Sequence, residues 1–389
     1  MKKKIAILGS TGSIGASTLN IIKKDKKNFE VVLLSTKNNF NKVFKQAIEF
    51  KVKNVVIKNN INVFWKKKFD QKKIKIFNNF ADFNKIFKSK LDYSINAISG
   101  LDGLDPTIRI IKHTKIIGIA NKESIICGWN LIHKELIKYK TKFIPIDSEH
   151  FSIFKLIEDK SKNNIQKIII TASGGPFLKK KIDKKIKIKD ALNHPNWKMG
   201  KKISIDSSTL MNKIFEVIEA KKIFDINLNK IQIIINPNSY IHASIIFKNG
   251  TIEMLAHETK MEIPIFNSIY DENKTNYPTK DIDIKKMNNL NFSIPSDKKF
   301  KTIKILNLIP HKDSLFETVL ISTNDELVDM FLKGKIKYNQ LLAYLLKIIN
   351  FKKLFETHVP KQGYRKIYCK VYHLHFPLIS HKYTLEGNP

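Results

Sequence analysis

The sequence predicts an α/β protein: an N-terminal doubly wound parallel sheet, then an α+β unit, then a small helical C-terminal unit. Short apolar segments alternate with helix-length segments through the first 147 residues. A glycine-rich turn follows the first of these segments, and a hairpin pattern occurs only later in the chain. Parallel strands covered by helices on both faces are apolar along their whole length, as these segments are.

The strand predictions in the N-terminal part are residues 5–8, 30–35, 55–57, 95–99 and 115–120. In the next part we expect a strand at 165–173, one helix at 206–224, a further strand at 231–237 and a hairpin at 241–257. The hairpin is expected to turn on Asn249 and Gly250 as a two-residue type I′ turn, because both residues tolerate positive φ. Residues 330–351 show a helical period, and 361–389 show none.

These elements divide the chain into four parts. We expect a dinucleotide-binding domain over 1–147 and an α+β domain over 148–270 that contains a lysine-rich lid loop at about 173–202. A polar linker at 271–300 then leads to a helical C-terminal domain at 301–389.

The formal net charge is +35, but the composition argues against a nucleic-acid partner. Arginine, which makes the bidentate base contacts, occurs only at Arg109 and Arg365, and lysine is spread through every segment. The cysteines, Cys127 and Cys369, cannot form a disulfide framework. No export signal or membrane-spanning segment is evident, so we expect a cytoplasmic protein without a nucleic-acid or membrane partner.

Gly9, Gly12 and Gly15 come directly after the first predicted strand and open a predicted helix. This arrangement, typical of a Rossmann-like domain, lets backbone amides and the helix dipole face a pyrophosphate. A purely structural strand-to-helix turn is the alternative. After the second strand an NAD enzyme would carry an acidic residue, whereas this chain has Lys37 and Asn38, which favour NADP; a plain surface lysine remains possible at that position.

Carboxylates suited to a divalent cation follow two later segments. Asp147 and Glu149 come after a further strand, and Glu216 lies four residues beyond Asn212, on the same face of a predicted helix. Hard cations prefer such oxygen ligands, so we expect an Mg²⁺ or Mn²⁺ site. Each carboxylate alone could instead complement a helix dipole, and we expect Glu219 to be solvated.

Hydroxyls and amides in 173–175 and 207–209, with the charge of Lys213, suggest a phosphate cradle. Trp197 and Met199 in the lysine-rich loop suggest a lid, with packing of the Trp on the core as the alternative.

These motifs occur in a fixed order between residues 9 and 244: GSTGSIG, NKES, DSEH, SGGPF, HPNWKMG, DSSTLMNK and SYIHAS. The pattern resembles the 1-deoxy-D-xylulose 5-phosphate reductoisomerase family. The resemblance implies that 1-deoxy-D-xylulose 5-phosphate is rearranged and reduced to 2-C-methyl-D-erythritol 4-phosphate, in non-mevalonate isoprenoid synthesis. It implies NADPH and Mg²⁺ or Mn²⁺ as cofactors, with Co²⁺ as a further candidate, and a homodimer formed through the middle domain.

The resemblance also implies roles for individual residues. The expected catalytic residues are Lys122, Glu149 and His150. The expected cofactor contacts are Thr11, Gly12, Ser13, Ile14, Lys37, Asn38, Asn121, Glu123 and Gly200. The expected substrate contacts are Lys122, Ser148, Glu149, Ser173, His194, Trp197, Ser207, Asn212, Lys213, Glu216 and His242. The expected metal ligands are Asp147, Glu149 and Glu216.

The sequence departs from the family pattern at 236–239, at 257–264, at 323–326 and in the loop at 37–39. Two alternatives therefore stay open. One is an NADP oxidoreductase that acts on another sugar phosphate, and the other is a non-catalytic nucleotide-binding relative.

Overall fold

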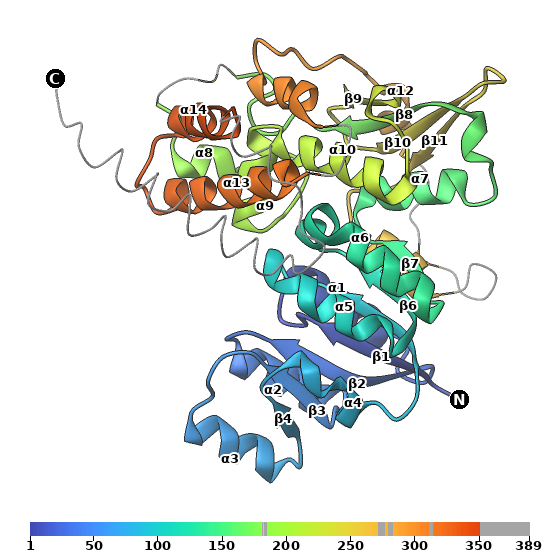
Figure 1. Ribbon diagram of the computed structural model, residues 1–389, viewed down its shortest axis with the longest axis vertical. Coiled ribbons are helices and arrows are strands. Elements are labelled where there is room, and N and C mark those ends of the chain that lie inside the picture. The colour runs from blue at the N-terminus through green and yellow to red at the C-terminus, as the bar shows by residue number, and fades with distance from the viewer. Residues whose placement is uncertain (181, 183–184, 271–276, 279–282, 311–313, 351–389) are drawn as a thin grey trace.

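The computed structural model describes residues 1–180, 182, 185–270, 277–278, 283–310 and 314–350. They form two sheets with their helices, and Figure 1 shows the first sheet in the lower half and the second, with the C-terminal helices, in the upper half. None of the described helices combines the length and apolar character needed to cross a membrane.

The first sheet has seven parallel strands in the order β4-β3-β2-β1-β5-β6-β7. Its strands are β1 (Lys3–Leu8), β2 (Phe29–Thr36), β3 (Asn54–Ile57), β4 (Lys75–Phe77), β5 (Leu91–Asn96), β6 (Thr114–Ile119) and β7 (Lys142–Pro145). Its helices are α1 (Ser13–Lys23), α2 (Phe40–Glu49), α3 (Val63–Gln71), α4 (Phe83–Ile86), α5 (Leu104–Ile111) and α6 (Lys122–Tyr139). The predicted doubly wound parallel sheet is confirmed.

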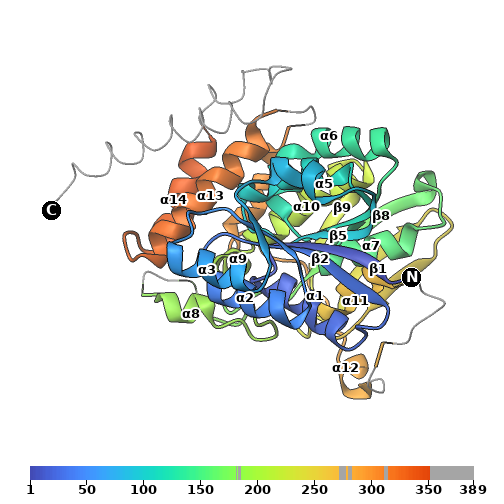
Figure 2. The same cartoon turned by 90° about the horizontal axis from the view of Figure 1, so that it is seen from below.

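Each face of this sheet buries a separate core. Ile5 and Ile7 of β1 point into one core with α1, α2 and α3, while Ala6 and Leu8 point into the other with α4, α5 and α6. Alternate residues of a strand face opposite sides, so a strand apolar at every position fills both cores. Figure 2 shows α1 and α2 on one side of the strands and α5 and α6 on the other.

The second sheet is mixed, in the order β11-β10-β8-β9. Its strands are β8 (Ile165–Ala172), β9 (Ile231–Ile235), β10 (Ile241–Phe247) and β11 (Ile252–Ala256). β8 and β9 are parallel, and β10 is antiparallel to both β8 and β11. The remaining helices are α7 (Ser148–Ile157), α8 (Ile188–Leu192), α9 (Lys201–Ser208), α10 (Met211–Phe224), α11 (Glu262–Ile269), α12 (Ile284–Asn288), α13 (Phe316–Leu332) and α14 (Tyr338–Ile349).

The described residues include five short 3₁₀ helices, Phe80–Asp82, Leu101–Gly103, Lys162–Asn164, Leu228–Lys230 and Lys301–Leu308. The largest core among the described residues lies between the second sheet and α10, α13 and α14. The predicted α+β unit and helical C-terminal unit therefore share one core.

The predicted hairpin forms, but its type I′ turn is wrong. Gly250 has φ +87°, while Asn249 does not have positive φ. The Phe247 N–H donates to the Thr251 carbonyl at 2.9 Å, and the Gly250 N–H donates to the Phe247 carbonyl at 3.0 Å. This is a three-residue loop in which a turn over 248–249 precedes a left-handed glycine.

Two predicted helices are each broken in two. The helix expected at 206–224 is interrupted at Leu210, whose φ is +63°, between α9 and α10. The helical period at 330–351 spans the end of α13 and all of α14, which are separated by Gly334 with φ +73°. There the Lys335 N–H donates to the Met330 carbonyl at 2.9 Å, the bond that closes a helix with a left-handed glycine.

The later part of the chain returns to the first sheet. α11 contributes Ile265, Phe266 and Ile269 to the core that covers α1, and Tyr93 of β5 shares a 2.7 Å hydrogen bond with Ser268. Figure 2 shows α11 on the same side of the sheet as α1. α12 lies inside the predicted linker, and the unassigned stretch 361–389 lies outside the described residues.

Candidate active site

The glycine loop joins β1 to α1 with almost no room for side chains. Gly9 has φ +80°, and a Cβ there would lie 2.7 Å from the Ala97 carbonyl oxygen. A Cβ on Gly15 would lie 2.5 Å from the Gly9 carbonyl oxygen, so the first turn of α1 packs directly on the loop. Gly12 and Ser13 are exposed at the start of α1, where no side chain caps the helix. The loop thus fits the pyrophosphate of a dinucleotide.

The loop after β2 places its two predicted cofactor residues at the surface. The Lys37 ammonium lies 2.8 Å from an Asp102 carboxylate oxygen, with both side chains about 60% exposed. Asn38 is exposed and hydrogen-bonds Asn59. Within the described residues, neither side chain forms a hydrogen bond or ion pair with the glycine loop. Lys42 of α2 does, because its ammonium donates to the Thr11 carbonyl at 2.8 Å.

Asn121 and Glu123 lie at the carboxyl end of β6, as predicted, but both side chains already bond to other groups of the protein. Asn121 caps α6 by accepting from the Ser124 N–H at 2.5 Å, and its amide donates to the carbonyls of Ile98 and Gly100. Glu123 is buried and pairs with the Lys202 ammonium at 2.6 Å. Asn121 therefore shapes the loop at 98–100 rather than presenting a free amide.

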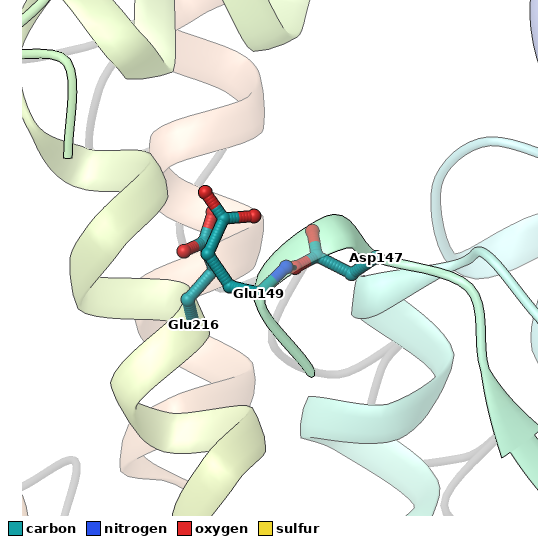
Figure 3. Close-up of side chains that lie close together, drawn as sticks. All are labelled: Asp147, Glu149 and Glu216. Carbon is teal, nitrogen blue, oxygen red and sulfur yellow. Dashed lines mark hydrogen bonds between the residues drawn. The ribbon is translucent and has the colours of Figure 1, made fainter. Parts of the chain in front are cut away.

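The three predicted metal ligands come together from two elements. Asp147 caps α7 through its Oδ1, which accepts from the Glu149 N–H at 3.1 Å, and Glu216 reaches toward both from α10 (Figure 3). One carboxylate oxygen from each of the three residues lies within 4.8 Å of the other two. No other group of this kind occurs among the described residues. A donor set made of carboxylate oxygens fits a hard divalent cation.

Two lysines neutralise this cluster. Lys122 lies 3.1 Å from Asp147, and Lys213 lies 2.6 Å from Glu149 and 2.5 Å from Glu216. Burial alone would lower the pKa of each ammonium, but the surrounding carboxylates raise the pKa of both above the usual value. The two lysines are therefore fully charged at neutral pH.

The pKa values of Asp147 and Glu216 are shifted in opposite directions. Burial alone would raise the pKa of Asp147, but Lys122 and His150 hold it well below its usual value. Burial and the neighbouring charge of Glu149 raise the pKa of Glu216 to about 8. The Glu216 side chain is only 1% exposed, and its other oxygen accepts from the Asn212 amide at 2.5 Å, which confirms that Asn212 and Glu216 share a helical face.

His150 ties two of the ligands together. Its Nδ1 lies 3.1 Å from Asp147 Oδ1, and its Nε2 donates to the Glu216 carbonyl at 2.9 Å. Although burial would lower the pKa of this imidazole, Glu219 and Asp147 raise it to about 9. The ring is therefore doubly protonated at neutral pH, which suits two acceptors.

The expectation that Glu219 is solvated is wrong. The side chain is 2% exposed and lies 3.4 Å from the Lys122 ammonium and 3.9 Å from His150. It follows Glu216 by three residues on α10, so both carboxylates face the same cluster. Sequence spacing could have indicated this, since residues three apart share a helical face.

The predicted phosphate residues lie around the break between α9 and α10. A Cβ on Gly175 would lie 2.7 Å from the Ser207 carbonyl oxygen, so the turn at 173–175 packs on the end of α9. Ser173 Oγ lies 3.0 Å from His194 Nε2, while His194 Nδ1 accepts from the Trp197 N–H at 3.0 Å. Burial and the charge of Lys213 lower the pKa of His194 to about 4, so this imidazole is neutral and donates through Nε2.

The lid residues meet the second sheet. Trp197 is half-buried and packs edge-on against His242, which stacks on His257 at 3.7 Å. Burial lowers the pKa of His242 to about 4.

Two further predicted site residues lie nearby in the sequence motifs. The Ser148 hydroxyl donates to a Glu149 carboxylate oxygen at 2.5 Å. Gly200, at the start of α9, has open space where a Cβ would lie.

One partly buried cluster was missed by the sequence reasoning. Lys202 of α9 contacts Glu123 of α6 at 2.6 Å and Asp325 of α13 at 2.9 Å, and Asp206 accepts from the Asn324 amide at 2.8 Å. These contacts join three helices that are far apart in sequence, and no local pattern marks such a contact.

The sequence matches three family models. They are described as 1-deoxy-D-xylulose 5-phosphate reductoisomerase at residues 5–128, its C-terminal domain at 143–224 and the DXP reductoisomerase C-terminal domain at 257–367. A 1-deoxy-D-xylulose 5-phosphate reductoisomerase of Pelagibacter ubique is 56% identical over 353 residues, covering 90% of this chain and 91% of that protein. The chain belongs to the 1-deoxy-D-xylulose 5-phosphate reductoisomerase family.

Further members of the family agree with this assignment. The reductoisomerase of Thermoanaerobacter sp. (strain X514) is 38% identical over 349 residues, covering 87% of this chain and 90% of that protein. The Zymomonas mobilis reductoisomerase in complex with NADPH has a TM-score of 0.88 at 26% identity, covering 99% of this chain and 100% of that one. A DOX-P reductoisomerase in complex with NADPH, fosmidomycin and magnesium has a TM-score of 0.87 at 27% identity, covering 97% and 98%.

Proposed function

We propose that this reductoisomerase-family chain converts 1-deoxy-D-xylulose 5-phosphate to 2-C-methyl-D-erythritol 4-phosphate, with NADPH and a divalent cation, Mg²⁺ or Mn²⁺. Family membership over 90% of the chain supports the reaction. The observation that carries the proposal is the meeting of Asp147, Glu149 and Glu216 within 4.8 Å, between two charged lysines.

When bound, the cation supplies Lewis-acid stabilisation of charge on substrate oxygens, and NADPH supplies the hydride. The chain's own residues bind the substrate and the cation and orient them. We assign ligand roles to Asp147, Glu149 and Glu216, while His150 positions two of them, because both of its ring nitrogens are engaged by Asp147 and the Glu216 backbone. Lys122 is fully charged beside Asp147, so we assign it the role of stabilising negative charge that develops on the substrate.

Substrate binding is proposed for the groups around the α9–α10 break. Ser173, Ser207, Asn212 and Lys213 offer hydroxyl, amide and ammonium donors that suit a phosphate monoester. Holding the phosphate fixes the small reacting end of the substrate, and closure of the loop that carries Trp197 would exclude water.

The domain assignment follows the same logic. We propose that 1–147 binds NADPH, that 148–270 carries catalysis and dimerisation with the lid at about 173–202, and that 271–300 links these to 301–389. The packing of α11 on the first sheet means that the middle part also braces the cofactor domain.

We also propose a homodimer formed through the second sheet. β11 is the edge strand of this sheet and leaves Ile252 54% and Met254 49% exposed. An exposed apolar edge strand is a ready surface for a second chain. Replacing both residues by Lys should give a monomer by light scattering, and an unchanged mass would contradict this interface. The free, buried thiol of Cys127 is in keeping with a cytoplasmic location.

The first experiment follows NADPH oxidation by absorbance with 1-deoxy-D-xylulose 5-phosphate, with and without Mg²⁺ or Mn²⁺. Glu149→Gln should lower metal-dependent turnover by about 100-fold or more, since even residues behind metal ligands contribute 10- to 100-fold. Glu158→Gln makes the same chemical change at the exposed end of α7 and should retain turnover. No turnover by folded wild type that still binds NADPH would favour another sugar phosphate or a non-catalytic relative.

A further inference from the structure

A compact group of donors lies beyond the end of β2, between the glycine loop and the start of α2. The hydroxyls of Thr11 and Thr36 lie 2.9 Å apart, and the Asn39 N–H donates to the Thr36 hydroxyl at 3.2 Å. The Lys42 ammonium donates to the Thr11 carbonyl at 2.8 Å. Hydroxyls, an amide and an ammonium thus converge at one place, and the N-terminal end of α2 adds a positive dipole.

The two lysines near this place differ in their surroundings. Lys37 is 60% exposed, and its charge is matched by Asp102 at 2.8 Å. Lys42 is partly buried and has no carboxylate partner in the described part of the chain. Lys42 is therefore the lysine that lies at the glycine loop with no carboxylate beside its ammonium.

The end of β2 also lacks the acidic group that holds an unphosphorylated ribose. At this position Ser35 accepts from the Gly9 N–H at 2.8 Å, so a neutral hydroxyl stands next to the glycine loop. In an NAD enzyme a carboxylate near here would accept from the ribose 2′-hydroxyl and would repel a phosphate. The local charge favours a phosphate monoester on the adenosine ribose.

We propose that Lys42 is the residue that determines NADPH specificity in this chain, by binding the 2′-phosphate together with Thr11, Thr36 and the start of α2. This inference rests on the proposed use of NADPH and assigns its selectivity to a residue that the sequence pattern did not single out. Lys37, which the sequence favoured for this role, instead pairs with Asp102 of the segment after β5.

The test measures cofactor binding directly, by fluorescence titration of the full chain with NADPH and with NADH, in the absence of sugar phosphate. Lys42→Ala should weaken NADPH binding by about 10-fold or more, the effect of losing one charge-assisted bond, and change NADH binding by less than about twofold. Lys42→Gln, which can still donate to Thr11, should show the same selective loss, and Lys42→Arg should retain the preference. Lys45→Ala, on an exposed position of α2, controls for the loss of one positive charge.

Equal loss of NADPH and NADH binding in Lys42→Ala would overturn the proposal and make Lys42 a brace for the glycine loop. A selective loss in Lys37→Ala, with Lys42→Ala unaffected, would overturn it in favour of Lys37. Because binding is read without turnover, absence of activity on 1-deoxy-D-xylulose 5-phosphate would contradict the proposed reaction and leave this test intact.

Discussion

Lys213 holds together two buried carboxylates, and replacing it should make the stability of the chain depend on metal. Its ammonium lies 2.6 Å from Glu149 and 2.5 Å from Glu216, and the three side chains are 10%, 12% and 1% exposed. Lys213→Met would remove the charge and leave both carboxylates without their closest cation. Breaking a buried ion pair in this way destabilises a protein by about 3–5 kcal/mol.

The lower end of that range applies here. Glu216 can take up a proton once Lys213 is gone, because burial and Glu149 already raise its pKa to about 8. We therefore expect a loss of about 3 kcal/mol in the free energy of unfolding at neutral pH without metal. Saturating Mn²⁺ neutralises the same carboxylates and should recover most of this loss, since a ligand that binds the folded state alone stabilises it.

The assay is urea unfolding of wild type and variant, each with EDTA and with excess Mn²⁺. Lys201→Met, at the exposed first residue of α9, is the matched control and should follow wild type in both conditions. In steady-state kinetics the KM for the sugar phosphate should also rise strongly in Lys213→Met or Lys213→Ala. Equal stability of variant and wild type in EDTA would refute the energetic argument, and an unchanged KM would refute the phosphate assignment.

Three further changes test other parts of the structure. Gly15→Ala should lower the free energy of unfolding by about 1–3 kcal/mol, because its Cβ would lie 2.5 Å from the Gly9 carbonyl oxygen. Gly12→Ala should instead stay folded and bind NADPH more weakly. Thermal unfolding measures the first effect and cofactor titration the second. Burial lowers the pKa of His113 to about 4, so as the pH falls the unfolded chain takes up a proton at this residue before the folded chain does. The free energy of unfolding should therefore fall as the pH drops from about 6.5 to 4. Urea unfolding of His113→Gln should show a weaker fall across this window. Lys202→Met should lower the thermal midpoint in the presence of metal as well as in EDTA, because its carboxylate partners lie outside the metal cluster, and a midpoint equal to wild type would contradict a structural role for this junction.

Much of the first sheet could be predicted because most of its strands contain a run of consecutive apolar residues. β1, β2, β3 and β6 hold near-continuous apolar runs, and the prediction misplaced only their ends. The strand predicted at 95–99 overlaps β5 at only two residues, because Asp92 and Ser94 interrupt the apolar pattern of β5. β4 was missed because Lys75–Phe77 is three residues long, lies at the sheet edge and carries a lysine. Its pairing with β3 is a long-range property that a short window of sequence does not contain.

Backbone breaks were harder to predict than strands. Leu210 adopts φ +63° between α9 and α10, although leucine is a good helix former and the apolar period continues through it. Tertiary packing overrides the local preference there. Gly334 was a readable signal, because glycine commonly ends a helix in the left-handed conformation, but the apolar period on both sides masked it.

In the site, the sequence motifs predicted which residues lie together, and the structure shows which of them contact one another. The i,i+4 spacing of Asn212 and Glu216 predicted their shared face, since one helix sets it. The pairing of Lys213 with Glu149 joins α10 to α7, and the stack of His242 on His257 joins β10 to the segment after β11. Contacts between separate elements depend on the whole fold, so single motifs could not give them.

The position of the carboxylates along the chain has a consequence for how the protein matures. Asp147 lies two residues after β7, the last strand of the first sheet, whereas Glu216 lies on α10, which packs in the core of the second sheet. A chain in which only one half has folded can offer only part of the ligand set. Tight cation uptake therefore reports that both halves have folded and docked, which makes metal affinity during refolding a direct readout of assembly.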